Sequence, residues 1–171
     1  MIFQTTRLKI RNLEYSDFPA FHEMQSNPKV MRYTTGRPLS EKENRESLGK
    51  CISSYAKPGN RFWVWAIEKK LDGAFVGTCA IVYDNEIGYR FLEKYWGKGY
   101  GKEISDGLIK YALEEMKAKK IIAYVDVENI ASVKILDRSA LKFEKEYFNE
   151  KEKCTERFYK FEKNKSGKLD I

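Results

Sequence analysis

The sequence predicts one mixed α/β domain, and three observations carry that prediction. Several stretches alternate apolar and polar residues, which is typical of strands. Other stretches repeat apolar residues every three or four positions, as amphipathic helices do. Finally, residues 86–126 have the pattern of a strand, a glycine-rich loop, a long helix and a second strand. Such a unit requires a right-handed crossover between parallel strands, so we expect a mixed sheet.

The N-terminal part predicts one strand followed by two helices. Residues 5–13 alternate as a strand does. Ser16 is a candidate N-cap for a short helix that the Asn-Pro pair at 27–28 ends. A second helix is expected to begin at Ser40, which can form a capping box with Glu43.

The remaining chain completes the order β-α-α-β-β-β-α-β-α-β-β. The expected strands are 61–68, 75–83, 86–92, 121–126, 143–149 and 155–161, and the expected helices are 102–116 and 132–138. No internal repeat or linker interrupts the chain, so we expect residues 1–171 to form a single domain. The lysine-rich residues 162–171 are expected to be a solvated tail.

Composition excludes several classes of protein. The 171 residues are 42% hydrophobic and 33% charged, which is typical of a globular chain. No apolar run is long enough to span a membrane, and the first residues lack the apolar core of a signal peptide. The three cysteines are widely spaced and form no CxxC pair, so neither a disulfide framework nor a metal site is expected. A reducing cytoplasm fits this composition best.

The net charge of +7 indicates an anionic ligand, an acidic surface or RNA as a partner. Aromatic residues near the C-terminus could stack on RNA bases. They alternate as the strands of a hairpin do, however, which favours packing, and direct nucleic-acid binding is not expected. These aromatic residues are Tyr147, Phe148, Phe158 and Tyr159.

A glycine-rich loop, Trp96-Gly97-Lys98-Gly99-Tyr100-Gly101, stands between an expected strand and the long helix. Glycines allow a bulky anion to approach the backbone N–H groups, and a helix N-terminus attracts negative charge. A pyrophosphate is the usual ligand of such a loop, although a tight turn without a ligand has the same sequence pattern. A Walker loop is excluded because Glu103, not Ser or Thr, follows Lys102. A dinucleotide fingerprint is excluded because position 102 is not glycine.

Four segments in order resemble one family, the GNAT N-acetyltransferases, over about residues 5–162. The strongest is Glu86-Ile87-Gly88-Tyr89 followed by residues 93–101, which is similar to the family's acyl-CoA site. The opening strand 5–11, the bend at 27–33 and the segment from Asn129 to Leu141 resemble further motifs. The overall pattern is most similar to the ribosomal-protein N-terminal (Rim-type) and spermidine acetyltransferases.

The resemblance implies how acetyl-CoA would bind. The strands 86–92 and 121–126 would splay apart, and the pantetheine arm would lie between them against the backbone of Tyr89, Arg90 and Phe91. Asn129 would hold the pantetheine or the acetyl end, and the acceptor pocket would come from the two N-terminal helices and the final hairpin. The pyrophosphate would sit on the loop residues Trp96, Gly97, Lys98, Gly99, Tyr100, Gly101 and Lys102.

Two residues are candidates for the chemistry. Glu86 is the candidate base, directly or through water, although it could be an ordinary solvent-facing residue at a turn. Many members of the family place a catalytic tyrosine where this chain has Leu136. Ser132, one helical turn earlier, is therefore the candidate to hydrogen-bond the CoA sulfur, both as a ligand of CoA and as a catalytic residue. Its alternative role, like that of Asn129, is to cap a helix.

The sequence therefore predicts an acetyl-CoA-dependent N-acetyltransferase that acts on a primary amine. An α-amine has a pKa of about 7.7–8.0, against about 10.4 for a lysine-like amine, so it needs only a modest base. A protein or peptide N-terminus, for example of a ribosomal protein, is the expected acceptor. A polyamine or antibiotic, a CoA-binding module without turnover, and an RNA-binding domain are the alternatives. The chain is expected to be a monomer or a homodimer.

Overall fold

The computed structural model describes residues 1–163, and these form one open eight-stranded sheet. The strand order is β1-β2-β3-β4-β5-β6-β8-β7, and the expected mixed α/β fold is confirmed. The expected tail at 162–171 lies outside the described residues except for its first two, and Glu162 is the last residue of a strand. The strands are β1 (Phe3–Gln4), β2 (Leu8–Asn12), β3 (Phe62–Lys69), β4 (Phe75–Val82), β5 (Glu86–Phe91), β6 (Lys120–Asp126), β7 (Lys142–Asn149) and β8 (Cys154–Glu162).

Five α-helices connect the strands. The expected capping box is confirmed: the Ser40 hydroxyl accepts the Glu43 N–H, and the Glu43 carboxylate accepts the Ser40 N–H. The long helix begins two residues earlier than expected, so the glycine loop runs directly into its first turn. The helices are α1 (Phe18–Gln25), α2 (Pro28–Met31), α3 (Glu41–Ser54), α4 (Tyr100–Glu114) and α5 (Ile130–Leu136).

The N-terminal region differs from the expectation in two places. The expected strand 5–13 is shortened to β2, because Thr5 begins a turn in which its N–H donates to the Leu8 carbonyl, and the additional strand β1 pairs with β2 ahead of that turn. Ser16 is not an N-cap. Glu14 begins a short 3-10 turn instead, and the Asp17 carboxylate accepts the Glu14 N–H. An acidic pair formed the cap, where the sequence pattern had favoured the nearby hydroxyl.

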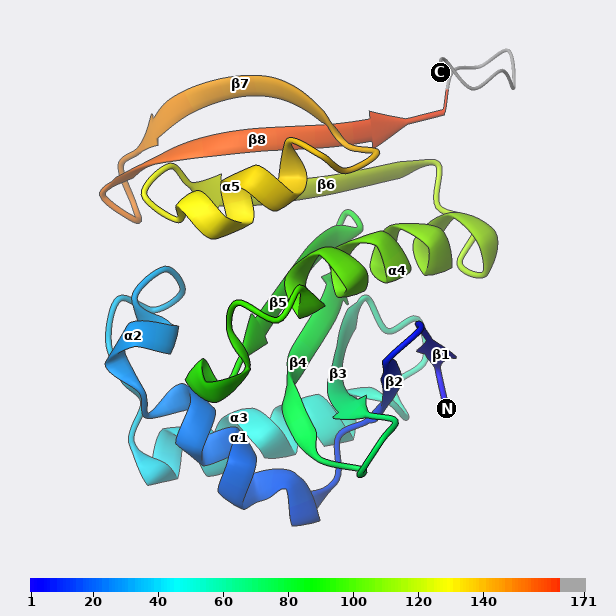
Figure 1. The fold of residues 1–171 in the computed structure, drawn as a ribbon, viewed down its shortest axis with the longest axis vertical. Coiled ribbons are helices and arrows are strands. Elements are labelled where there is room, and N and C mark those ends of the chain that lie inside the picture. The colour runs from blue at the N-terminus through cyan, green and yellow to red at the C-terminus, as the bar shows by residue number, and fades with distance from the viewer. Residues whose placement is uncertain (164–171) are drawn as a thin grey trace.

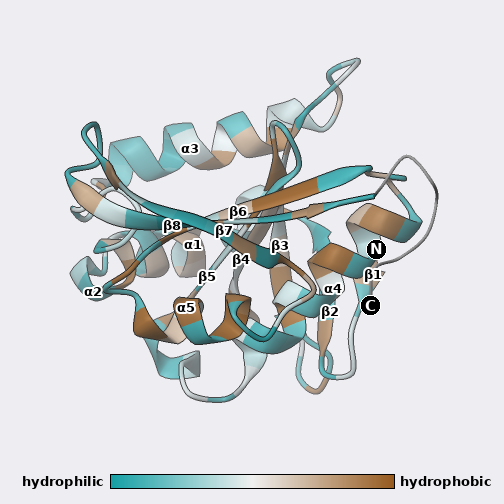
Figure 2. Ribbon diagram, turned by 90° about the horizontal axis from the view of Figure 1, so that it is seen from above, coloured by the Kyte–Doolittle hydropathy of each residue, from teal (hydrophilic) through white to brown (hydrophobic). Residues whose placement is uncertain are grey.

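Helices cover both faces of the sheet. In Figure 2, α3 lies on one side of the strands, while α4 and α5 lie on the other. One apolar core, with Trp65, Ile104 and Tyr159, lies largely beneath α4 and α5. A second core, with Phe21, Met24 and Leu48, lies beneath α1 and α3. A binding site for a ligand between these layers therefore has to form where the packing opens.

The sheet opens between β5 and β6. The antiparallel strands β4 and β5 are paired along the whole of β5, whereas the parallel strands β5 and β6 are paired only at Glu86 and Ile122. Beyond that pair the two strands diverge, which Figure 1 shows as a separation between β5 and the layer of β6, β8 and β7. The splayed central parallel strands expected from the sequence are confirmed.

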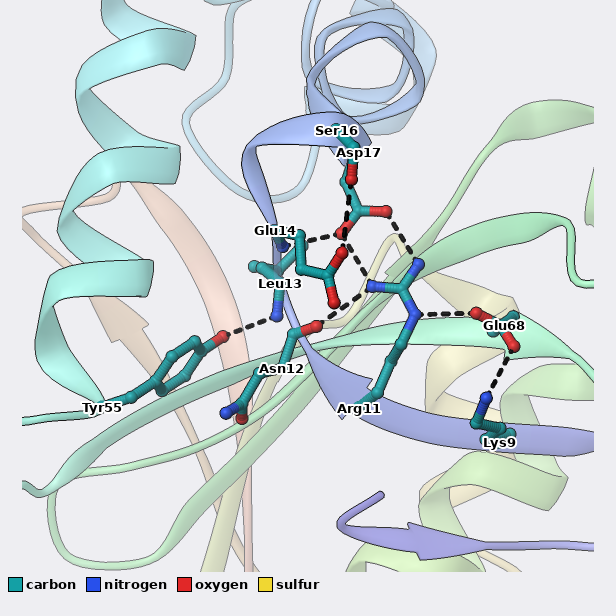
Figure 3. A network of polar contacts seen from close by, with 9 residues as sticks. All are labelled: Lys9, Arg11, Asn12, Leu13, Glu14, Ser16, Asp17, Tyr55 and Glu68. Carbon is teal, nitrogen blue, oxygen red and sulfur yellow. Dashed lines mark hydrogen bonds and ion pairs between the residues drawn. The ribbon is translucent and has the colours of Figure 1, made fainter.

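A polar network anchors the start of the chain to the sheet (Figure 3). The Arg11 guanidinium donates two hydrogen bonds of 2.8 Å to the Asp17 carboxylate and one of 2.7 Å to Glu68. Arg11 and Glu68 lie on neighbouring strands, and Asp17 lies in the turn before α1. The two carboxylates raise the pKa of Arg11, and Arg11 holds the pKa of Glu68 below its usual range.

Candidate acetyl-CoA site

The glycine loop presents free backbone donors at the start of α4. Gly97 and Gly99 have φ angles of +72° and +78°, a region that residues with a Cβ rarely adopt. Gly99 is the N-cap of α4, and the first backbone hydrogen bond of the helix runs from Glu103 to the Gly99 carbonyl. The N–H groups of the intervening first-turn residues therefore have no partner within the helix. This arrangement fits a pyrophosphate, because those donors and the helix dipole both favour an anion.

Arg7, which is distant from the glycine loop in the sequence, bonds to the loop and to the first turn of α4. Its Nη1 donates to the Lys98 carbonyl at 2.9 Å, and its Nε lies 2.7 Å from the Glu103 carboxylate. Burial raises the pKa of Glu103, but hydrogen bonds from Thr5 and Arg7 outweigh burial and leave it below its usual range. The Arg7 guanidinium also lies 4.6 Å from the centre of the Tyr100 ring. The sequence pattern gave Arg7 no role, because its partners lie more than ninety residues away.

Trp96 and Gly101 were predicted to contact the pyrophosphate, and the structure shows contacts of both with other parts of the protein. The Trp96 N–H is already used by the Glu93 carbonyl, and the Trp96 indole donates to the Phe91 carbonyl at 3.1 Å. A Cβ on Gly101 would lie only 2.7 Å from the Ile135 side chain. Trp96 thus braces the loop against β5, and Gly101 allows α4 to approach α5 closely.

The lysines of the loop are exposed. The Lys98 ammonium lies 5.2 Å from the centre of the Tyr95 ring. Lys102 forms an ion pair of 2.6 Å with Asp106, one helical turn later. Both side chains border the free N–H groups, where their positive charge would favour an anion.

The open edge of β5 exposes the backbone of alternate residues. The Leu92 N–H donates to the Val76 carbonyl on β4, and the Arg90 carbonyl approaches β4 so closely that a Cβ on Gly77 would lie 2.1 Å from it. Backbone groups of successive strand residues point to opposite neighbours. Those of Tyr89 and Phe91 therefore face the gap toward β6, although the Phe91 carbonyl is taken by Trp96. Of the three residues predicted to line the pantetheine, Arg90 turns its carbonyl to β4.

Two hydroxyl groups, one from β5 and one from α5, lie near each other. The Tyr89 hydroxyl is buried and has no hydrogen-bond partner in residues 1–163. Burial raises the pKa of Tyr89 to about 12, with a small opposing effect of the nearby Ser132 hydroxyl. Asn129 caps α5, since its side-chain oxygen accepts the Ser132 N–H at 3.3 Å. Leu136 is 4% exposed and belongs to the core, and the role of Ser132 stays a prediction.

Glu86 lies at the end of β5 where the strands still pair. The side chain is half-buried, and burial, followed by repulsion from Glu156, raises the pKa of its carboxyl group. Burial, followed by the charge of Glu86, raises the pKa of Tyr124, whose ring stacks on Phe158 with the centroids 5.0 Å apart. A carboxyl group with a raised pKa is a better match for proton transfer near neutral pH than an ordinary one.

A cleft of about 390 Å³ lies between the end of α2, the end of β6 and the β7–β8 hairpin. Arg32 forms an ion pair of 3.0 Å with Glu128, and the Tyr33 hydroxyl donates to the Glu128 carbonyl. These bonds join the N-terminal helices to β6 across the open end of the sheet. The cleft thus occurs between the elements that were expected to form the acceptor pocket.

Residues 1–163 hold no cluster of three metal-ligating side chains, and no helix among them is both long and apolar enough to cross a membrane. The three cysteines are free, and burial raises the pKa of the Cys51 thiol to about 11.

Comparisons with known proteins agree with this geometry. The profile of the acetyltransferase (GNAT) domain matches residues 7–142. An uncharacterized N-acetyltransferase, p20 from Bacillus licheniformis, is 32% identical over 150 residues, which cover 83% of this chain and 82% of that protein.

Two solved structures share the fold. The RimL ribosomal L7/L12 alpha-N-protein acetyltransferase in complex with coenzyme A has a TM-score of 0.79 at 16% identity, covering 94% of this chain and 97% of that one. The spermidine N-acetyltransferase from Vibrio cholerae, in complex with CoA and spermine, has a TM-score of 0.77 at 20% identity, covering 92% and 96%. At such identities these two structures establish the fold and leave the acceptor open. The chain belongs to the GNAT acetyltransferase family, and it is an N-acetyltransferase whose co-substrate is acetyl-CoA.

Proposed function

We propose that this enzyme acetylates the N-terminal α-amine of a protein or peptide, as Rim-type acetyltransferases do. The observation that carries the proposal is Glu86, a half-buried carboxyl group with a raised pKa at the paired end of β5 and β6, where the gap between them begins. Such a group is a modest base. Roughly a quarter to two fifths of an α-amine is neutral at pH 7.5, so a modest base suffices for it, whereas a lysine-like amine needs stronger help.

In this proposal the co-substrate lies along the gap. The N–H groups from Gly97 to Lys102 bind the pyrophosphate, with Lys98 and Lys102 beside them. The backbone of Tyr89 and Phe91 and the side chain of Asn129 face the pantetheine arm. Acetyl-CoA supplies an activated acyl group and a thiol that can leave.

Protein groups then assist two changes: the amine loses a proton, and the sulfur develops negative charge. Glu86, directly or through water, accepts the proton that the amine must lose. The neighbouring hydroxyls of Ser132 and Tyr89 are the candidates to stabilise the negative charge on the sulfur. Tyr89 keeps its proton at neutral pH because its pKa is about 12, so it can serve as a hydrogen-bond donor.

Thiol release from acetyl-CoA tests the proposal. The purified protein is mixed with peptides that carry different N-terminal residues, with polyamines, with aminoglycoside antibiotics and with a lysine side-chain analogue. We expect turnover with peptide α-amines, and a ribosomal-protein N-terminus among the better acceptors because the chain has a net charge of +7 and would be drawn to ribosomal RNA.

Turnover confined to polyamines or antibiotics would replace the proposal with the small-molecule alternative. CoA binding without any turnover would indicate a sensor module, and light scattering on the same sample distinguishes a monomer from a homodimer.

A further inference from the structure

Arg90 carries a cation that no carboxylate of residues 1–163 neutralises. Its side chain leaves β5 on the face opposite Tyr89 and Phe91, toward the N-terminal helices. Nη1 donates to the Gln25 side-chain oxygen at 2.9 Å and lies 3.6 Å from the Met31 sulfur. Burial lowers the pKa of Arg90, and the only titratable group that acts against this is the Cys51 thiol, which is itself neutral at pH 7 because burial raises its pKa to about 11.

Gln25 beside it has a donor with no acceptor. The residue is 4% exposed, and while its oxygen accepts from Arg90, its amide nitrogen has no hydrogen-bond partner in residues 1–163. Gln25 thus has a buried donor without a partner, and the half-buried Arg90 beside it has a charge without a counter-ion; both are costly. Their occurrence side by side is explained if a ligand brings an anionic oxygen to them.

The position of Arg90 connects this pair of donors to the reaction. Arg90 directly follows Tyr89, whose backbone faces the gap. Gly88 and Glu86 share its face of β5, because side chains alternate along a strand. Apart from Gly88 and its two chain neighbours, no heavy atom of residues 1–163 lies within 4 Å of the place where a Cβ of Gly88 would stand, so this face of the strand is open at Gly88. Four residues of strand separate these two by about 13 Å between Cα atoms, and both side chains can reach inward from there.

We propose that Arg90 and Gln25 recognise a carboxylate on the acceptor, close to the amine that is acetylated. The acceptor lies over Gly88, with its amine toward Glu86 and its carboxylate against the two donors. The carboxylate is either the α-carboxylate of an amino acid or the side chain of an acidic residue at the start of a peptide. A polycation would meet the Arg90 charge and is disfavoured. This inference rests on the acetylation of an α-amine proposed above.

Matched pairs of acceptors test the inference. One pair is a peptide beginning with glutamate and the same peptide beginning with glutamine; the other is a free amino acid and its carboxamide. For each pair the kcat/KM ratio of acid to amide is measured in the wild type, in Arg90→Met and in Arg61→Met. Arg61 is the control because it is an exposed arginine that pairs with Asp84 at the far end of β3 and β4. The amine pKa differs within a pair, but comparison of the ratio between proteins cancels that difference.

We expect the ratio to fall by about ten- to a hundred-fold in Arg90→Met, the scale of a lost charged hydrogen bond, and to stay unchanged in Arg61→Met. The pair that shows the effect identifies the source of the carboxylate. Equal ratios in the wild type and Arg90→Met overturn the inference while leaving the acetylation of α-amines intact. If Arg90→Met does not fold, the wild type alone decides, with each kcat/KM divided by the neutral fraction of that amine: no preference for the acid in either pair overturns the inference. Absence of turnover with every amine overturns both this inference and the proposed function.

Discussion

At the scale of single residues, two neighbouring hydroxyls are the candidates to stabilise the leaving group. Leu136 is buried in the core and cannot donate a proton, so the sulfur must be stabilised by another group. The sequence suggested Ser132 for this purpose. The structure adds Tyr89, whose hydroxyl is buried beside Ser132 without a partner.

Ser132→Ala is expected to lower kcat by about ten- to a thousand-fold, the scale of one hydrogen bond to a transition state. Acetyl-CoA affinity should change by no more than a few-fold, because the Asn129 cap bonds the Ser132 backbone and survives the change. Steady-state kinetics and calorimetry measure the two quantities. Ser53→Ala is the control, since the Ser53 hydroxyl bonds only the Lys50 carbonyl on the exposed side of α3. An unchanged kcat would leave the Ser132 hydroxyl without a role in the reaction and direct attention to Tyr89→Phe.

Glu86→Gln is expected to lower kcat, and to lower it more for lysine-like amines than for α-amines, because the former need deprotonation most at pH 7. The wild-type rate should rise with pH as Glu86 loses its proton, at a pH above the usual carboxyl range because burial raises its pKa. The variant should lose that limb of the pH–rate profile. Glu46→Gln, on the exposed face of α3, is the control. A loss that is equal for all amines would point to a different base.

At the scale of elements, the glycine loop and α4 act together. Gly99→Ala forces a Cβ into a left-handed conformation, places it 3.4 Å from Arg7, and crowds the free N–H groups. We expect CoA affinity to fall at least ten-fold in calorimetry. Gly59→Ala matches the strain, since Gly59 has a φ of +67° with open space around it, but it lies far along the chain at the end of α3. If both variants bind CoA as the wild type does, the loop does not hold the pyrophosphate.

The elements differ in how far the sequence predicts them. Strand alternation, the Ser40 capping box and the strand–loop–helix unit are local patterns, and the structure confirms them. The shortened strand at 5–13 and the Glu14 cap were missed because they depend on how the chain meets α4 and β3. The same holds for the site: glycines and family motifs located the loop, but the orientation of Gly101 toward Ile135 and the contact between Tyr89 and Ser132 follow from the packing of α4 and α5 on β5.

At the scale of the whole molecule, the N-terminal segment is tied to distant elements by two carboxylates with lowered pKa values. Glu68 receives hydrogen bonds from Arg11 and Lys9, and Glu103 receives them from Thr5 and Arg7. A carboxylate whose pKa is lower in the folded state stabilises the fold above its unfolded pKa of about 4.3, and this stabilisation is lost as the pH falls through the folded value. Acid should therefore loosen the N-terminal segment.

The melting temperature is expected to be steady near neutral pH and to fall as the pH drops below about 4.3, where these carboxylates begin to take up protons. Glu68→Gln should have a lower melting temperature at pH 7 and a shallower decline in acid, because one of the responsible groups has been removed. Thermal melts monitored by circular dichroism between pH 3 and pH 7 measure both effects. Parallel pH profiles for the variant and the wild type would show that other groups control the acid response.

The contact between Arg7 and the glycine loop has a consequence for how the protein is handled. Thr5 and Arg7 hold Glu103 and the Lys98 carbonyl, and Phe3 packs so closely on α4 that a Cβ on Gly107 would lie 2.9 Å from its ring. The first residues of the chain thus set the shape of a binding surface that they are not expected to touch. We expect a label or fusion that disturbs residues 3–7 to change co-substrate affinity as well as yield, so such changes are best avoided in kinetic work.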